Sequence, residues 1–207
     1  MTLIITDVQR DFMPGGTLGV SGANFIIQTI NQLIPKFDHV VAVRDWHPPG
    51  HVSFASTHGK RTGETIKIGG VEQILWPDHC IQDTRGAHLA DGLETAKIEA
   101  MLNKGTDPLV DSYSGFFDSH RHRSTGLADF LKEHKLKELY FVGVATDYCI
   151  LYSVLDALEL GFKVTVIVDA CRAINRRLGD ENRAIEAMKA KGAKIVTAEE
   201  LLKSFAQ

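Results

Sequence analysis

The 207-residue sequence lacks long hydrophobic runs, carries no excess of basic residues and contains only three cysteines. No apolar run approaches the roughly 20 residues that a membrane-spanning helix needs, and no secretory signal stands at the N-terminus. With 23 Lys+Arg against 26 Asp+Glu, the net charge of −3 argues against a nucleic-acid partner. An odd, low cysteine count is typical of free thiols in a reducing compartment. We therefore expect a cytoplasmic protein with neither a membrane nor a nucleic acid as its partner.

What is present describes an ordinary globular chain with one unusual feature. Hydrophobic residues make up 44% and charged residues 24%, which are typical values for globular domains. The length suits one domain over residues 1–207, large enough to fold without disulfides or metals. Four of the nine histidines, however, fall within residues 47–79. This crowding needs an explanation of its own.

Short Val- and Ile-rich runs alternate with amphipathic segments along most of the chain. Such alternation predicts an α/β fold, a three-layer αβα sandwich with a mostly parallel, Rossmann-like central sheet. The predicted strands are 3–6, 40–43, 98–102, 139–144, 164–168 and 194–196. The predicted helices are 24–34, 126–134, 149–160, 182–191 and 199–205.

The segment from about 45 to 93 interrupts this alternation. It contains three prolines and seven glycines and has no long periodic stretch. Long irregular segments in compact domains are usually functional or disordered. We interpret it as a loop insertion within the single domain.

Reactive side chains follow the predicted strands. Asp7, Asp45, Lys104 and the segment 145–149 come at carboxyl ends of strands, where open parallel sheets bind ligands. Cys149 opens a predicted helix, whose N-terminus lowers a thiol pKa and supplies N–H donors for an oxyanion. A nucleophilic thiol with Asp7 as base and Lys104 as cation is one interpretation. The alternatives are a buried structural cysteine, a capping aspartate and a solvated lysine.

The histidine-rich insertion suggests a metal site. Asp45 and His47 are two residues apart, so in an extended segment their side chains point the same way. His51 or His79 could complete a set of one carboxylate and two or three imidazoles, which suits zinc or a similar divalent ion. The alternative is that these histidines only form hydrogen bonds.

Beyond these arguments, the chain resembles nicotinamidases (pyrazinamidases) of the isochorismatase-like cysteine hydrolase superfamily. The shared motifs run in family order from about residue 3 to 170. They are Ile5-Thr6-Asp7-Val8-Gln9-Arg10-Asp11-Phe12, Arg44-Asp45-Trp46-His47-Pro48, Trp76-Pro77-Asp78-His79-Cys80, Lys104-Gly105, Asp111-Ser112-Tyr113-Ser114-Gly115-Phe116 and Gly143-Val144-Ala145-Thr146-Asp147-Tyr148-Cys149. The segment between His51 and Trp76 departs from compact members by the additional residues 60–64.

The resemblance implies a catalytic triad of Asp7, Lys104 and the nucleophile Cys149. It also implies an oxyanion hole from the N–H groups of Ala145 and Cys149, after a cis Val144–Ala145 peptide bond. The implied reaction converts nicotinamide to nicotinic acid and ammonia through a Cys149 thioester, with pyrazinamide as a second substrate.

The same resemblance implies a divalent ion, with zinc favoured and iron or manganese as alternatives. Its ligands would be Asp45, His47 and His79, and His51 matches a ligand in some members only. The ion would orient the pyridine ring in an aromatic pocket. Phe12, Trp76 and Tyr113 match the positions that line this pocket.

Three other interpretations stay open on sequence. The first is an amidase of the same superfamily acting on another small amide or ureido compound. The second is a zinc hydrolase whose metal-bound hydroxide attacks while Cys149 is incidental, and the third is a binding module without catalysis. The sequence also leaves open a homo-oligomer and the role of the 58–70 loop.

Overall fold

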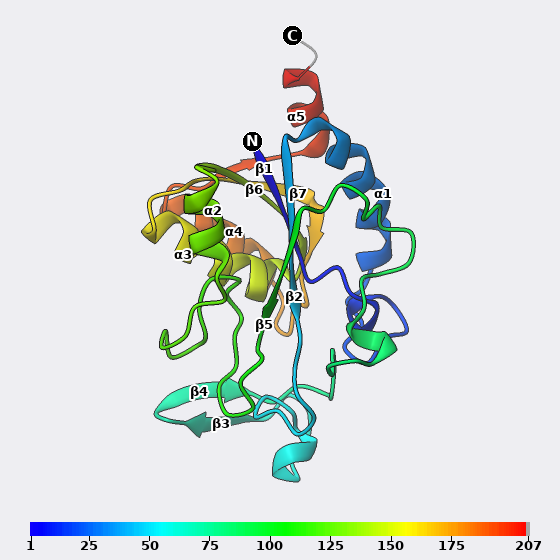
Figure 1. The fold of residues 1–207 in the computed structure, drawn as a ribbon. Helices are drawn as coiled ribbons and strands as arrows, with labels where there is room; N and C mark the ends of the chain where they lie inside the picture. The colour runs from blue at the N-terminus through cyan, green and yellow to red at the C-terminus, as the bar shows by residue number, and fades with distance from the viewer. Residues whose placement is uncertain (206–207) are drawn as a thin grey trace.

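Six parallel strands form the central sheet of the computed structural model, which describes residues 1–205 (Figure 1). Every neighbouring pair in this sheet is parallel, which confirms the predicted α/β class. The central strand β1 is buried along its whole length, as expected for a strand covered on both faces. In spatial order the strands are β5 (Ala100–Lys104), β2 (His39–Asp45), β1 (Thr2–Thr6), β6 (Glu138–Val144), β7 (Lys163–Arg172) and β8 (Lys194–Val196).

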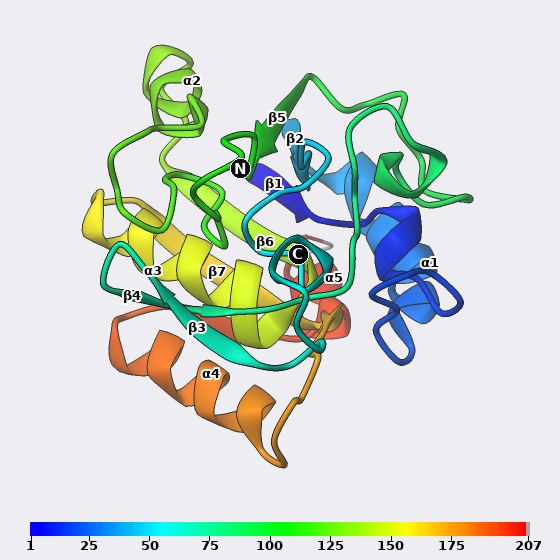
Figure 2. The ribbon, with the colours of Figure 1, turned by 90° about the horizontal axis from the view of Figure 1, so that it is seen from below.

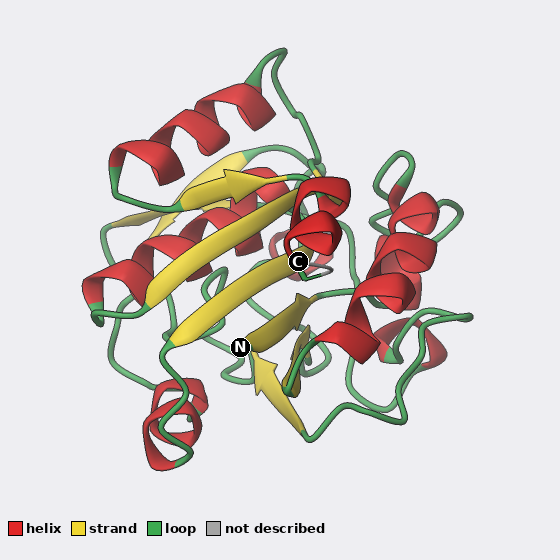
Figure 3. Cartoon of the chain, turned by 90° about the horizontal axis from the view of Figure 1, so that it is seen from above, coloured by secondary structure: helices red, strands yellow, loops and turns green. Residues whose placement is uncertain are grey.

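Helices cover both faces of the sheet and complete the predicted three layers (Figure 3). One apolar cluster contains residues of α1 (Ala23–Leu33) and α5 (Ala198–Ser204). A second cluster, on the other face, contains residues of α2 (Leu127–Glu133), α3 (Leu151–Glu159) and α4 (Asp180–Ala190). No helix among residues 1–205 combines the length and apolar character needed to cross a membrane. Short 3-10 turns occupy Arg10–Phe12, Ile34–Lys36, Ser56–His58 and Arg85–Ala87.

The irregular segment 45–93 contains a β-hairpin that the sequence analysis missed. Strands β3 (Thr65–Ile68) and β4 (Val71–Ile74) pair antiparallel around Gly69 and Gly70. Both glycines have positive φ, 56° and 86°, as a two-residue type I′ turn requires. Two glycines between short β-branched runs are the signal that could have predicted it. The hairpin lies beyond the carboxyl ends of β2 and β5 in Figure 1 and beside α3 and α4 in Figure 2.

Two predicted elements differ in their bounds around β6. The helix expected over 149–160 begins with a π-helical turn at Thr146–Ile150, because the Ile150 N–H donates to Ala145 O five residues earlier. The strand expected over 164–168 extends to Arg172, with a register shift opposite Phe141 and Gly143. These irregularities adjoin the strand end that carries the candidate nucleophile.

The strand order places the candidate site. Connections run outward in opposite directions from the neighbouring strands β1 and β6, so the crevice between their carboxyl ends is the expected ligand position. Gly143 permits close packing there, because a Cβ at that position would stand 1.9 Å from Thr6 O. The carboxyl ends of β5, β2, β1 and β6 are adjacent, so the residues at these four ends lie around one crevice.

Candidate active site

Asp7, Lys104 and Cys149 meet in this crevice, as the strand order requires. Asp7 follows β1, Lys104 is the last residue of β5, and Cys149 lies in the turn after β6. The Lys104 Nζ lies 3.1 Å from Asp7 Oδ2 and 3.4 Å from Cys149 Sγ. It also donates to Ser112 O at 3.1 Å. A buried ammonium thus stands between a carboxylate and a thiol.

Burial dominates the electrostatics of the acid and the thiol. It raises the pKa of Asp7 to about 7, although Lys104 opposes the rise. Burial likewise raises the pKa of Cys149 well above its usual value, again against Lys104. The expectation that the helix N-terminus would lower the thiol pKa is therefore wrong for this state of the site. Because the thiol keeps its proton, a thiolate requires a nearby acceptor.

Asp7 has the properties of that acceptor. Both of its carboxylate oxygens are buried, and Oδ2 faces the Lys104 ammonium at 3.1 Å. A carboxylate oxygen of Asp7 and the Cys149 Sγ lie within 4.8 Å of each other. The peptide bond between Val144 and Ala145 is cis, as the resemblance implies. Ala145 and Cys149 both line a cavity next to this group.

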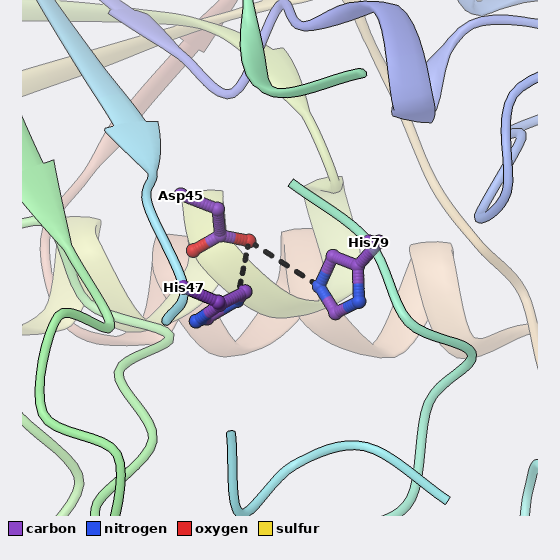
Figure 4. Close-up of side chains that lie close together, drawn as sticks. All are labelled: Asp45, His47 and His79. Atoms are coloured by element: carbon purple, nitrogen blue, oxygen red, sulfur yellow. Dashed lines mark ion pairs between the residues drawn. The ribbon is translucent and has the colours of Figure 1, made fainter. Parts of the chain in front are cut away.

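Asp45, His47 and His79 form a second group beside the first (Figure 4). The Nε2 atoms of His47 and His79 lie 3.5 and 3.6 Å from Asp45 Oδ2. Ligands about 2.1 Å from one tetrahedral ion stand roughly 3.4 Å apart, so the spacing fits a shared divalent cation. His47 Nδ1 donates to Gly105 O and His79 Nδ1 to Pro77 O, which leaves both Nε2 lone pairs free for a metal.

His51 lies next to this group. Its ring stacks on that of His47 at 4.1 Å between centroids. Its Nδ1 accepts the Ser53 N–H at 3.3 Å and lies 2.7 Å from Ser53 Oγ, and its Nε2 is buried without a hydrogen-bond partner among the described residues. Burial lowers the pKa of His51 to about 4, so the ring is neutral, as a ligand must be. The Asp45, His47 and His79 donor set therefore fits a divalent ion, whereas His51 groups with His47 and Asp111.

An inner cavity is lined by Cys149 of the first group and by all three residues of the second. Phe12, Trp76 and Tyr113 also line it. Trp76 Nε1 donates to Tyr113 Oη at 3.0 Å, and the Trp76 ring meets that of Tyr148 edge-on at 5.1 Å. The complete lining is Phe12, Leu18, Asp45, His47, Trp76, His79, Asp111, Ser112, Tyr113, Ala145, Tyr148, Cys149 and Ile174. Its walls suit a flat aromatic ring placed between a thiol and a metal centre.

Comparison with known proteins identifies the family. The isochorismatase domain matches residues 1–200. The chain belongs to the isochorismatase family. It is 44% identical to the nicotinamidase of Escherichia coli over 199 residues, covering 94% of this chain and 93% of that protein.

Two solved structures share the fold of this family member closely. The Acinetobacter baumanii nicotinamidase and pyrazinamidase superposes with a TM-score of 0.93 at 41% identity, covering 97% of each chain. The pyrazinamidase of Pyrococcus horikoshii in complex with zinc gives 0.78 at 39% identity, covering 95% of this chain and 98% of that one.

Several lining residues of this isochorismatase-family cavity were absent from the sequence prediction. Leu18 and Ile174 come from irregular segments, where no periodicity indicates which side chains face inward. Tyr148 belongs to the Gly143–Cys149 motif and directly precedes the candidate nucleophile. Its place in this turn was therefore the signal that could have indicated it. The segment 173–179, between β7 and α4, carried no signal at all.

Proposed function

We propose that this protein hydrolyses nicotinamide to nicotinate and ammonia. The observation that carries the proposal is one cavity lined both by the Cys149 thiol, which has Lys104 and Asp7 beside it, and by the Asp45–His47–His79 set. Similarity to proteins named nicotinamidase supports the choice of substrate. Three free thiols support the cytoplasm as its location.

The first half of the reaction is acyl transfer to the thiol. Asp7 accepts the proton of Cys149 as the sulfur attacks the carboxamide carbon, and Lys104 stabilises the charge. The N–H groups of Ala145 and Cys149 hold the oxygen of the tetrahedral intermediate. Asp7 then returns the proton to the leaving nitrogen, so ammonia departs and a thioester remains.

Hydrolysis of the thioester completes the cycle. Asp7 accepts a proton from water, whose oxygen attacks the thioester carbon. The carbon–sulfur bond breaks, nicotinate forms, and the proton returns to the Cys149 sulfur. An acid with a pKa of about 7 suits both directions of this transfer, since it can accept and release a proton near neutral pH.

Asp45, His47 and His79 would hold the divalent ion, with His51 as a further ligand. When bound, the ion supplies a Lewis-acidic position for the pyridine nitrogen. We propose zinc, with iron or manganese as alternatives, because one carboxylate with imidazoles suits these ions and a pyrazinamidase of similar structure is described in complex with zinc. Phe12, Trp76 and Tyr113 would pack against the ring. Pyrazinamide, which has a similar ring and the same carboxamide, would be a second substrate.

Ammonia release from nicotinamide by the purified protein, run beside metal analysis of the same sample, tests the proposal. We expect turnover with one metal ion per chain. Turnover of a ureido compound or an aliphatic amide, with none of nicotinamide, would favour an amidase of different specificity. Absence of turnover with every amide, at full metal content, would favour a binding module.

A further inference from the structure

The additional segment 60–64 has no part in the proposed chemistry, yet it contacts the rim of the inner cavity. We infer that Arg176 is a positioning residue that closes the rim by joining the 173–179 segment to Gly63. The inference rests on the proposed function only for the identity of the substrate.

The Arg176 side chain lies against three groups at the rim, one backbone carbonyl and two aromatic side chains. Its Nη2 donates to Gly63 O at 2.7 Å, a contact between residues 113 positions apart. Its guanidinium carbon lies 5.7 Å from the centroid of the Trp76 ring. The guanidinium also lies beside the Tyr148 hydroxyl, where it opposes the rise in the Tyr148 pKa that burial causes. Trp76 and Tyr148 both line the inner cavity, so one side chain contacts two of its walls.

One end of this connection is fixed to the nucleophile turn. Asp147, two residues before Cys149, accepts the N–H of Ile174 at 2.9 Å and that of Asn175 at 2.8 Å. Ile174 lines the inner cavity. The backbone that carries Arg176 is therefore tied to the turn that presents the thiol.

The other end is fixed to the wall formed by Trp76. Gly63 N–H donates to Leu75 O at 2.7 Å, and Leu75 N–H donates to Glu64 O at 2.8 Å. Leu75 directly precedes Trp76. Gly63 has a φ of +88°, a conformation that favours glycine. In this conformation its carbonyl oxygen accepts from Arg176 while its N–H donates to Leu75 O.

Arg176 also lies at the border between two cavities. A larger outer cavity of about 540 Å³ is lined by residues of the β3–β4 hairpin, α3 and α4. Figure 2 shows these elements side by side. Tyr113 and Tyr148 line both cavities, whereas Arg176 lines only the outer one. The contact between Arg176 and Gly63 therefore spans the side on which the inner cavity meets the outer one.

Arg176→Ala should loosen this rim without touching the reacting groups. We expect KM for nicotinamide to rise about 5- to 10-fold while kcat changes less than about twofold, the pattern for lost binding of substrate and transition state alike. Arg176→Lys should restore part of the loss, because lysine retains a donor for Gly63 O but not the planar contacts. Arg177→Ala is the matched control, since the Arg177 side chain lines the same outer cavity and hydrogen-bonds to no described residue.

Alkylation of the metal-loaded protein by iodoacetamide, followed by mass spectrometry of each cysteine, measures access to the thiol without any turnover. We expect Arg176→Ala to speed modification of Cys149 at least about fivefold, with core Cys171 still protected. Equal acceleration at Cys171 would indicate general loosening and overturn the inference. So would an Arg176→Ala variant that matches Arg177→Ala in both KM and Cys149 alkylation. Because alkylation needs no nicotinamide, a failure of the proposed substrate is distinguishable.

Discussion

Asp45 and Lys104 are register partners at the ends of β2 and β5, and their side chains form a buried ion pair. Asp45 Oδ1 accepts from Lys104, while Oδ2 faces the Nε2 atoms of His47 and His79. Although burial opposes it, Lys104 and His47 hold the pKa of Asp45 well below its usual range. One carboxylate therefore joins the catalytic ammonium to the metal ligands.

This arrangement predicts different costs for two metal-site variants. Asp45→Ala and His79→Ala should both lose the metal and weaken nicotinamide binding. Only Asp45→Ala also removes a partner from the buried Lys104, at a cost of about 3 kcal/mol in unfolding free energy. Thermal unfolding after chelator treatment should place its Tm about 6 to 12 °C below that of treated wild type.

The His79→Ala variant serves as the control in that experiment. Its Tm after chelation should fall less than that of Asp45→Ala. His79 does not pair with Lys104, and its loss removes only one local hydrogen bond and ring contacts with Phe12 and Phe54. Equal Tm values for the two variants would contradict the bridging role of Asp45.

The pH dependence of turnover should follow Asp7. With the pKa of its carboxyl raised to about 7 by burial, Asp7 is protonated below that pH and cannot accept the Cys149 proton. We expect kcat/KM to rise with pH and to level off above about pH 7, with a roughly tenfold loss per pH unit on the acid side. Metal content must be measured at each pH, since histidine ligands lose metal when protonated. An acid limb near pH 4, at constant metal content, would contradict the assignment.

Gly105 should be required for metal binding. A Cβ at this position would stand 2.3 Å from the His47 ring, and Gly105 O accepts the His47 Nδ1–H that orients the ring. Gly105→Ala should lower metal affinity about 10- to 100-fold, measured by competition with a chelating dye.

Gly161→Ala is the matched control for that substitution. Gly161 also has a positive φ, +85°, but a Cβ there would meet nothing within 4 Å. Both variants carry backbone strain, and only Gly105→Ala displaces a ligand. Equal metal affinities in the two variants would refute the positioning role of Gly105.

The sequence predicted the sheet well because buried parallel strands leave a strong signal. Runs of Val and Ile indicated β1, β2 and β6, and the rule for strand ends predicted that Asp7, Asp45 and Lys104 lie together. The β3–β4 hairpin was missed because its four-residue strands are largely exposed and alternate too briefly to stand out from a loop. The π-helical turn before α3 was missed because a single five-residue backbone bond, from Ile150 N–H to Ala145 O, leaves no periodic signal in the sequence.

The site was predicted less evenly than the fold. Asp45 and His47 share a local spacing, so chemistry alone indicated them, whereas the pocket positions Phe12, Trp76 and Tyr113 were available only from resemblance. The low thiol pKa expected for Cys149 was wrong because a helix-end argument omits burial, which dominates here. Contacts such as that between Arg176 and Gly63 join segments with no periodicity, so only the folded chain brings them together.

The central claim is that the Cys149 sulfur is the nucleophile, and ammonia release by metal-loaded Cys149→Ala tests it most directly. Cys149 is small, buried and outside the Asp45, His47 and His79 group, so the variant should fold and bind one metal ion per chain. We predict that it releases ammonia from nicotinamide at the rate of a blank without enzyme. Substantial turnover by this variant at full metal content would contradict the account and assign the attack to a metal-bound hydroxide.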